Sequence, residues 1–255
     1  MSQAVASSTR SSQGALAGRR LLLIGAGGLG CAALWALADS GATFVIADDD
    51  RVEASNLHRQ ILFGAESVGE DKLDAAFAEL VRRGVPSRRI ELVRSRFLPH
   101  NARTLARGVD LLLEGADNFA TKFLTADAGH LEKRPVVHGA AVRFDATVLY
   151  VAAEGRPCYR CLFEDVPAEA AQQNCAGAGV LGPLVGIAGA LMADFALRAL
   201  VHEEVPHARL ASYGARTDRL REIEIPANPR CPLCGAAPTI SEIDETRYTA
   251  PSCAA

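Results

Sequence analysis

Short apolar runs alternate with longer alanine- and leucine-rich or amphipathic stretches in the part of the chain before Arg143. Short buried runs predict strands, and longer stretches with apolar positions three or four residues apart predict helices. Together they predict an α/β fold with a mostly parallel sheet and helices on both faces. The predicted strands are Arg20–Ile24, Thr43–Ala47, Ile90–Val93, Val109–Leu113 and Val136–Val137, and the predicted helices are Cys31–Asp39, Lys72–Arg83 and Thr121–His130.

The pattern changes after Arg143. Ala146–Ala152 and Leu220–Ile225 alternate apolar and polar residues, which predicts half-exposed antiparallel strands in the C-terminal part of the fold. Between them, Cys175–Ala193 contains no charged residue over 19 positions, a length that could cross a bilayer. Because this stretch holds five glycines and Pro183, we favour a buried loop that leads into a core helix, and we expect no membrane contact.

The composition predicts the domain organisation and argues against some classes of function. The 255 residues are 49% hydrophobic and 22% charged, which is typical of a globular protein. Residues 1–18 are rich in Ser, Ala and Gln and lack the apolar centre of a secretory signal, so we expect a flexible segment there. We expect one domain over residues 19–235, a loosely ordered tail over 236–255, and a cytoplasmic location. The 27 basic residues are scattered, which argues against nucleic-acid binding.

A glycine-rich loop follows the first predicted strand. Gly25, Gly27 and Gly30 fit the G-x-G-x-x-G pattern, with Gly28 inside it, and a helix and a second strand come next. Such glycines let phosphates approach the backbone at a helix N-terminus. Asp48 ends the second strand, where a carboxylate can accept hydrogen bonds from a ribose hydroxyl. This Rossmann-like unit predicts a nucleotide site but leaves NAD, FAD and ATP open.

Polar residues beyond this unit favour ATP. Asn56, Arg59 and Lys72 follow the acidic cluster, and cations there would stabilise the negative charge that develops when ATP is split at the α-phosphate. Asp117 and Asn118 follow another predicted strand, at the edge of the sheet where ligands bind, and a carboxylate can hold Mg²⁺. Taken alone, the two cations would more often be surface charges, and Asp117-Asn118 a turn or helix cap.

These segments, taken in order, resemble the ThiF/MoeB/HesA family of adenylating enzymes, relatives of the ubiquitin-activating enzymes. The matching segments are Gly25-Ala-Gly-Gly-Leu-Gly30, Asp48-Asp-Asp50, Ser55-Asn-Leu-His-Arg-Gln60, Val68-Gly-x-x-Lys72, Gly115-Ala-Asp-Asn118, His138-Gly-Ala-Ala141, Cys158-Tyr-Arg-Cys161, Gly179-Val-Leu-Gly-Pro183 and Cys231-Pro-Leu-Cys234. They extend over nearly the whole chain.

The resemblance implies an activity, a partner and a set of site residues. The C-terminal glycine carboxylate of a small ubiquitin-fold sulfur carrier ending in Gly-Gly would attack the α-phosphate of ATP, which gives an acyl-adenylate and pyrophosphate. Arg59, Lys72 and Asp117 would act in catalysis, with Asp117 holding Mg²⁺. The ribose would lie on Asp48, and the glycine loop, Asp50, Asn56 and Asn118 would complete the nucleotide site. The resemblance and the apolar segment Val180–Ala193 also lead us to expect a homodimer.

Two Cys-x-x-Cys pairs predict a metal site. Four thiolates from Cys158, Cys161, Cys231 and Cys234 suit a closed tetrahedral Zn²⁺ site, with redox pairing as the alternative. The family uses its pairs to bind zinc. In the ThiF branch, a cysteine that matches Cys175 forms a covalent link to the carrier, although a lone cysteine is more often a small buried residue.

One family feature is missing. Many members begin with a helix that carries Arg-Tyr-x-Arg-Gln, and neither Arg10, Arg19 nor Arg20 has that setting. Two alternatives therefore stay open. The same fold could adenylate a peptide or a small-molecule carboxylate, or the chain could be an NAD-binding or non-catalytic Rossmann protein.

Overall fold

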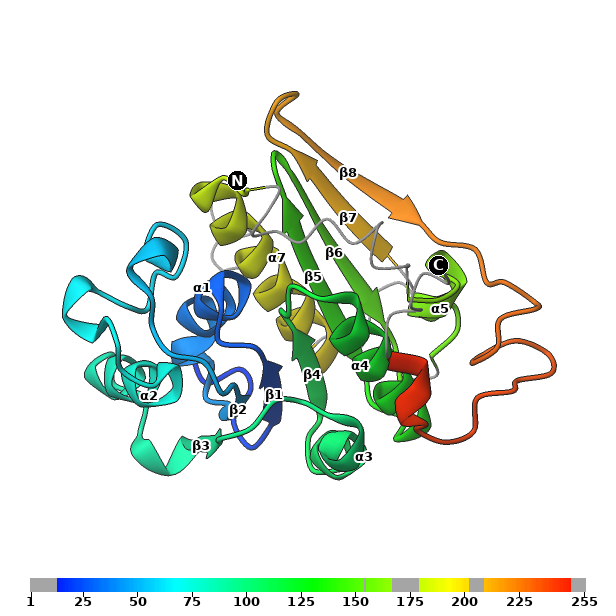
Figure 1. The fold of residues 1–255 in the computed structure, drawn as a ribbon, viewed down its shortest axis with the longest axis horizontal. Coiled ribbons are helices and arrows are strands. Elements are labelled where there is room, and N and C mark those ends of the chain that lie inside the picture. The colour runs from blue at the N-terminus through cyan, green and yellow to red at the C-terminus, as the bar shows by residue number, and fades with distance from the viewer. Residues whose placement is uncertain (1–12, 154, 167–178, 202–208, 249–255) are drawn as a thin grey trace, which may run out of the picture.

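The computed structural model describes residues 13–153, 155–166, 179–201 and 209–248. Eight strands form one sheet in the order β3-β2-β1-β4-β5-β6-β7-β8 (Figure 1). The pairings from β3 to β5 are parallel, and those from β5 to β8 are antiparallel. The strands are β1 Arg20–Ile24, β2 Thr43–Ala47, β3 Ile90–Val93, β4 Leu111–Glu114, β5 Val136–Val142, β6 Asp145–Val151, β7 Arg209–Gly214 and β8 Arg219–Glu224. The helices are α1 Gly28–Leu37, α2 Lys72–Arg82, α3 Pro99–Arg107, α4 Phe119–Leu131, α5 Tyr159–Leu162 and α7 Gly182–Val201.

Alternation along the strands divides the core into two layers. In β1, Leu21 and Leu23 pack with α1, α2 and α7, whereas Leu22 and Ile24 pack on the opposite face with α3, α4 and α5. This arrangement confirms the predicted α/β class, with helices on both faces of a largely parallel sheet and antiparallel strands at its C-terminal side. The parallel strands all end at the same edge, where ligands bind in open sheets of this kind.

Helix α7 is a core helix. It is the one helix in the described part of the chain that is long and apolar enough to cross a membrane. Leu184, Ala188, Met192 and Phe195 are buried, and the helix packs closely on α1 and on β5 and β6. A methyl group on Gly189 would lie 2.4 Å from Cβ of Ala32, so glycine permits the close helix crossing. This packing agrees with the predicted core helix, while the homodimer stays a prediction.

The structure differs from the sequence predictions in three places. Helix α3 was not predicted because only Ala102 and Ala106 are buried on it, which leaves little apolar signal. The segment predicted to be flexible, residues 1–18, includes Leu16, which is fully buried and whose amide donates to the Ser40 carbonyl. The tail beyond residue 235 is packed as far as Tyr248: Ile240 and Tyr248 belong to the core layer of α3 and α4.

Candidate active site

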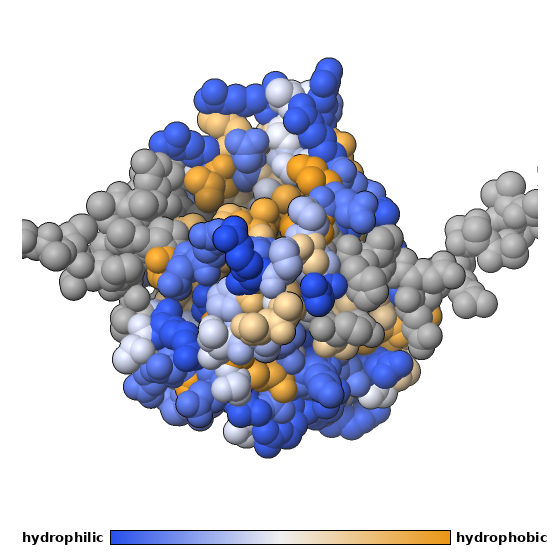
Figure 2. All heavy atoms as spheres, turned by 90° about the vertical axis from the view of Figure 1, so that its right-hand side faces the viewer, coloured by the Kyte–Doolittle hydropathy of each residue, from blue (hydrophilic) through white to orange (hydrophobic). Residues whose placement is uncertain are grey.

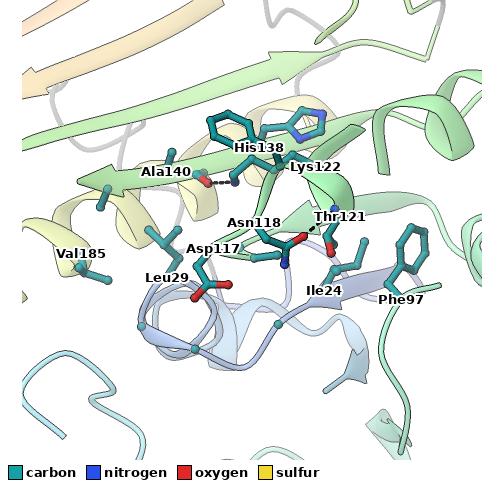
Figure 3. Close-up of a pocket in the computed structure, with 18 of the residues that line it drawn as sticks. Ile24, Leu29, Phe97, Asp117, Asn118, Thr121, Lys122, His138, Ala140 and Val185 are labelled. Carbon is teal, nitrogen blue, oxygen red and sulfur yellow. Dashed lines mark hydrogen bonds between the residues drawn. The ribbon is translucent and has the colours of Figure 1, made fainter. Parts of the chain in front are cut away.

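A cavity of about 660 Å³ opens at the C-terminal ends of the parallel strands. The glycine loop, the loop between β4 and α4, and the far half of β5 form its walls (Figure 3). The cavity brings together most of the residues predicted to bind nucleotide or to act in catalysis. Those that line it are Gly25, Gly27, Gly28, Asp48, Asp50, Asn56, Arg59, Lys72, Asp117 and Asn118.

The glycine loop is shaped for close approach of a ligand. Gly25 has φ +89°, a conformation that side chains rarely tolerate. A methyl group on Gly27 would meet no atom within 4 Å, so the backbone here faces open space. Gly30 instead packs α1 onto the loop, because a methyl group there would lie 2.1 Å from the Gly25 carbonyl oxygen. The loop thus presents bare backbone and a helix N-terminus, which suits phosphate.

Asp48 supports this loop from the end of β2. Its Oδ2 accepts a hydrogen bond of 2.7 Å from the Ala26 amide, and its Oδ1 accepts one of 2.8 Å from the Asp50 amide. Burial raises the pKa of Asp48, although Lys72 and the two amides act against it. The carboxylate therefore already braces the glycine loop, and its contact with a ribose stays a prediction.

Two cations line the same end of the cavity. The Lys72 ammonium is buried and lies 2.8 Å from Oδ2 of Asp50 and 3.9 Å from Oδ1 of Asp48. Helix α2 fixes its position, since the Asp71 carboxylate accepts a hydrogen bond from the Leu73 amide at the N-cap. Arg59 is half-buried, and no carboxylate within the described ranges pairs with it. Its guanidinium charge is therefore available for an anion.

The side chains of Asp117 and Asn118 differ in their hydrogen bonds. Figure 3 shows the Asp117 carboxylate projecting toward the glycine loop. It has no hydrogen-bond or ion-pair partner among the residues that the structure covers. By contrast, Oδ1 of Asn118 accepts a hydrogen bond of 2.8 Å from the Thr121 amide and caps α4. For Asn118 the helix-cap interpretation is therefore correct, which leaves only the side-chain nitrogen for a ligand.

A buried charged cluster behind Asp117 was not predicted. Lys122, on α4, places its Nζ 2.8 Å from Oε2 of Glu114 and 2.6 Å from the Gly139 carbonyl oxygen. Nδ1 of His138 lies 3.2 Å from the same Glu114 oxygen, and the Ala116 amide donates to Oε1. Two signals in the sequence could have revealed the cluster: Glu114 ends the apolar run Leu111–Leu113, and Lys122 lies inside a largely apolar helix. Charged side chains can be buried at such positions only when they are paired.

The cluster has a defined charge state. Burial tends to raise the pKa of Glu114, but Lys122 and His138 outweigh it and the pKa is lowered. Burial also lowers the pKa of His138, against the opposing effect of Glu114. We infer a neutral His138 that donates Nδ1–H to a charged Glu114. The ionised pair of Glu114 and Lys122 therefore holds the β4–α4 loop, with Asp117, against β5.

The other half of the cavity is mostly apolar. Tyr159, Leu162 and Phe163, from α5 and the residue after it, line this half together with strand residues of β5, β6 and β7. Leu162 and Phe163 are also partly exposed at the surface. Figure 2 shows apolar side chains exposed between a hydrophilic projection at the top and a hydrophilic lower body. The sequence analysis missed this wall, together with Arg96 and Phe97 at the β3 side of the cavity.

The four paired cysteines meet in space. Their sulfur atoms all lie within 4.8 Å of one another, with 3.5 Å between Cys158 and Cys231 and 3.4 Å between Cys161 and Cys234. The hydrogen bond to Cys234 and burial raise the pKa of Cys158, and electrostatic repulsion between neighbouring thiolates raises it further. A divalent cation would remove this repulsion, and four sulfur ligands suit tetrahedral Zn²⁺. The donor set therefore fits the predicted structural zinc site.

Known proteins are similar to this chain in sequence over most of its length. A model of the ThiF family matches residues 2–233. The chain belongs to the ThiF family. The sulfur carrier protein adenylyltransferase of Thermus thermophilus is 40% identical to this ThiF-family chain over 230 residues, which cover 88% of this chain and 84% of the relative. The SAMP-activating enzyme E1 of Haloferax volcanii is 37% identical over 236 residues, 91% and 87% of the two chains.

Solved structures show the same fold. The E. coli MccB structure with MccA-N7isoASN has a TM-score of 0.75 and 20% sequence identity, and the match covers 88% of this chain and 69% of that one. At this identity the likeness extends to the fold alone. The Rossmann-like class predicted from the glycine loop is thus confirmed.

We expect Cys161→Ser to abolish zinc binding at the predicted site. Serine is a poor zinc ligand, and the site joins α5 to the C-terminal segment, so loss of metal should also lower the melting temperature by several degrees. Metal content by plasma mass spectrometry and calorimetry would measure both effects. Cys31→Ser is the matched control, since Cys31 is buried far from the cluster and burial raises its pKa to about 12. Stoichiometric zinc in both variants would contradict the site.

Two other predictions have different outcomes. Cys175, the proposed covalent residue, lies outside the described residues. Arg19 lies 3.7 Å from Asp110, and Arg20 forms two hydrogen bonds with Glu91, at the end of the sheet opposite the cavity. Both arginines are therefore remote from the cavity of their own chain, and Arg10 lies outside the described residues.

Proposed function

We propose that this protein adenylates the C-terminal glycine carboxylate of a small ubiquitin-like sulfur-carrier protein, in the biosynthesis of a cofactor or another sulfur-containing metabolite. The observation that carries the proposal is the division of one cavity into two halves. One half has bare glycine backbone and the cations Arg59 and Lys72, and the other half has a mostly apolar lining, with Asp117 at the cavity wall between β4 and α4. The two relatives named above are a sulfur carrier protein adenylyltransferase and a SAMP-activating enzyme E1, which supports the choice of a carrier protein as substrate.

The chemistry follows from the charges. A carboxylate oxygen of the carrier attacks the α-phosphorus, the bond to the bridging oxygen breaks, and pyrophosphate leaves. Negative charge builds up on the phosphoryl oxygens during this step. Arg59 and Lys72 would stabilise that charge, and Asp117 would hold Mg²⁺, which neutralises the phosphates when bound. The backbone amides of the glycine loop would bind the remaining phosphate oxygens.

ATP–pyrophosphate exchange tests the proposal. We expect exchange that depends on a purified ubiquitin-fold carrier ending in Gly-Gly. The same carrier without its last glycine should give none, because the reacting carboxylate is then displaced from the α-phosphate. Exchange supported by a small carboxylate or a short peptide alone would favour the alternative substrate class. Tight NAD binding without any exchange would overturn the adenylation mechanism.

A further inference from the structure

Tyr159 connects the cysteine cluster to the cavity. It lies between Cys158 and Cys161 in the single turn of α5, and its side chain is one of those that line the cavity. Its ring centroid lies 4.6 Å from that of His138, 5.2 Å from Phe123 and 4.9 Å from Phe163. Three rings from three different segments thus fix the orientation of the phenol.

The α5 turn is itself held firmly. Arg160, the next residue, is buried and forms hydrogen bonds of 2.7 and 2.9 Å with both carboxylate oxygens of Asp127 on α4. The Tyr248 hydroxyl donates to the same carboxylate from the C-terminal segment. With the cysteines on either side, these contacts leave the Tyr159 backbone little freedom to move. A side chain placed so rigidly can position a ligand with little loss of conformational entropy.

The Tyr159 hydroxyl group lacks a partner within the described ranges. Only 4% of the residue is exposed, yet its oxygen neither donates nor accepts a hydrogen bond within these ranges. The oxygen is also not among the fully buried side-chain atoms without a hydrogen-bond partner. A buried phenol normally has a partner, because desolvation without a hydrogen bond is costly. Because Tyr159 lines the cavity, a substrate in that space is the partner that we infer for its hydroxyl.

We propose that Tyr159 is a substrate-positioning residue whose hydroxyl forms a hydrogen bond with a main-chain amide group of the acyl tail. The proposal rests on the function proposed above. The neighbouring wall is mostly apolar, with Leu149 and Leu210 on the strands and Leu162 and Phe163 beside the tyrosine. The phenol is one of its few polar groups, together with His138 and Thr147. An extended glycine tail has no side chain to bind, and its recognition must use its peptide groups.

The test uses two synthetic probes and isothermal titration calorimetry. One probe is 5′-O-sulfamoyladenosine, which occupies only the nucleotide half. The other carries glycylglycine on the sulfamate nitrogen and so mimics the acyl-adenylate. The ratio of their dissociation constants isolates the contribution of the Gly-Gly part. Tyr159→Phe removes the hydroxyl but keeps the ring and its three stacking contacts, so the fold and the metal content should be unchanged.

We expect Tyr159→Phe to weaken binding of the glycylglycyl probe about fivefold, the usual effect of one neutral hydrogen bond, and to leave sulfamoyladenosine binding unchanged. Tyr213→Phe is the matched control, because it removes an exposed hydroxyl that bonds Asp218 on the β7–β8 hairpin, and both affinities should stay at the wild-type value. Equal ratios in wild type and Tyr159→Phe would overturn the role of Tyr159 alone. If the wild-type protein bound the glycylglycyl probe no more tightly than sulfamoyladenosine, the proposed acyl site would be overturned as well.

Discussion

Asp117→Asn is expected to lower carrier-dependent ATP–pyrophosphate exchange by at least about two orders of magnitude. The substitution keeps the shape of the side chain but removes the negative charge that would hold Mg²⁺ over the phosphates. Because the Asp117 carboxylate has no partner in the described part of the chain, its loss breaks no internal contact, and the fold should be retained. The exchange rate at saturating ATP and carrier is the measurement.

A matched carboxylate tests whether this loss is specific. Asp39 is exposed at the end of α1 that is remote from the glycine loop, so Asp39→Asn should keep wild-type exchange. Circular dichroism and the melting temperature of both variants would establish that the fold is intact. Wild-type exchange in Asp117→Asn would remove Asp117 from the mechanism and would place the metal on another group, of which the acidic cluster Asp48–Asp50 is the nearest candidate.

Lys122→Met is expected to destabilise the protein by about 3 kcal/mol. Glu114 is fully buried, and its charge is balanced by Lys122 at 2.8 Å. Removal of the lysine leaves a carboxylate without its counter-ion in the core, where it must either stay charged at high cost or take up a proton. Chemical denaturation near neutral pH would measure the change in the free energy of unfolding.

A double-mutant cycle separates the ion pair from simple loss of packing. Glu114→Gln with Lys122→Met should recover a large part of the lost stability, since no unpaired charge remains in the core. The exposed pair of Arg94 and Asp74, with 2.5 Å between Nη2 and Oδ1, is the control, and Arg94→Gln should hardly change the unfolding free energy. If the double variant were no more stable than Lys122→Met, the ion pair would not be the source of the effect.

The nucleotide half of the site could be predicted because its signals are local. A G-x-G-x-x-G loop after an apolar strand requires only its own neighbours to form, and Asp48 follows at the end of the next strand. The parallel sheet then brings Asp117 and Lys72 to the same edge without further information. Asn118 caps α4 and also lines the cavity, so capping, a local signal of this residue type, is observed while its contact with the nucleotide stays a prediction.

The half of the cavity that we propose for the acyl tail could not be predicted, because its residues are far apart in the chain. Tyr159, Leu210 and His138 meet only after β5, β6 and β7 pair in register, which places Leu149 opposite both His138 and Leu210. The packed C-terminal segment was missed for the same reason. Its tyrosine is held by Asp127, a residue 121 positions earlier that looks like an ordinary surface charge in the sequence.

The sequence by itself determined the α/β class, the nucleotide loop, the two cysteine pairs and the family resemblance, since each depends on periodicity or on short spacings. Only the tertiary structure decided which charges are buried and paired and which face the cavity. It also decided that Tyr159, which lies between two of the clustered cysteines, lines the cavity wall. The physical reason is that burial, and with it the strength of a charge or a hydrogen bond, depends on contacts between distant segments rather than on the residue type.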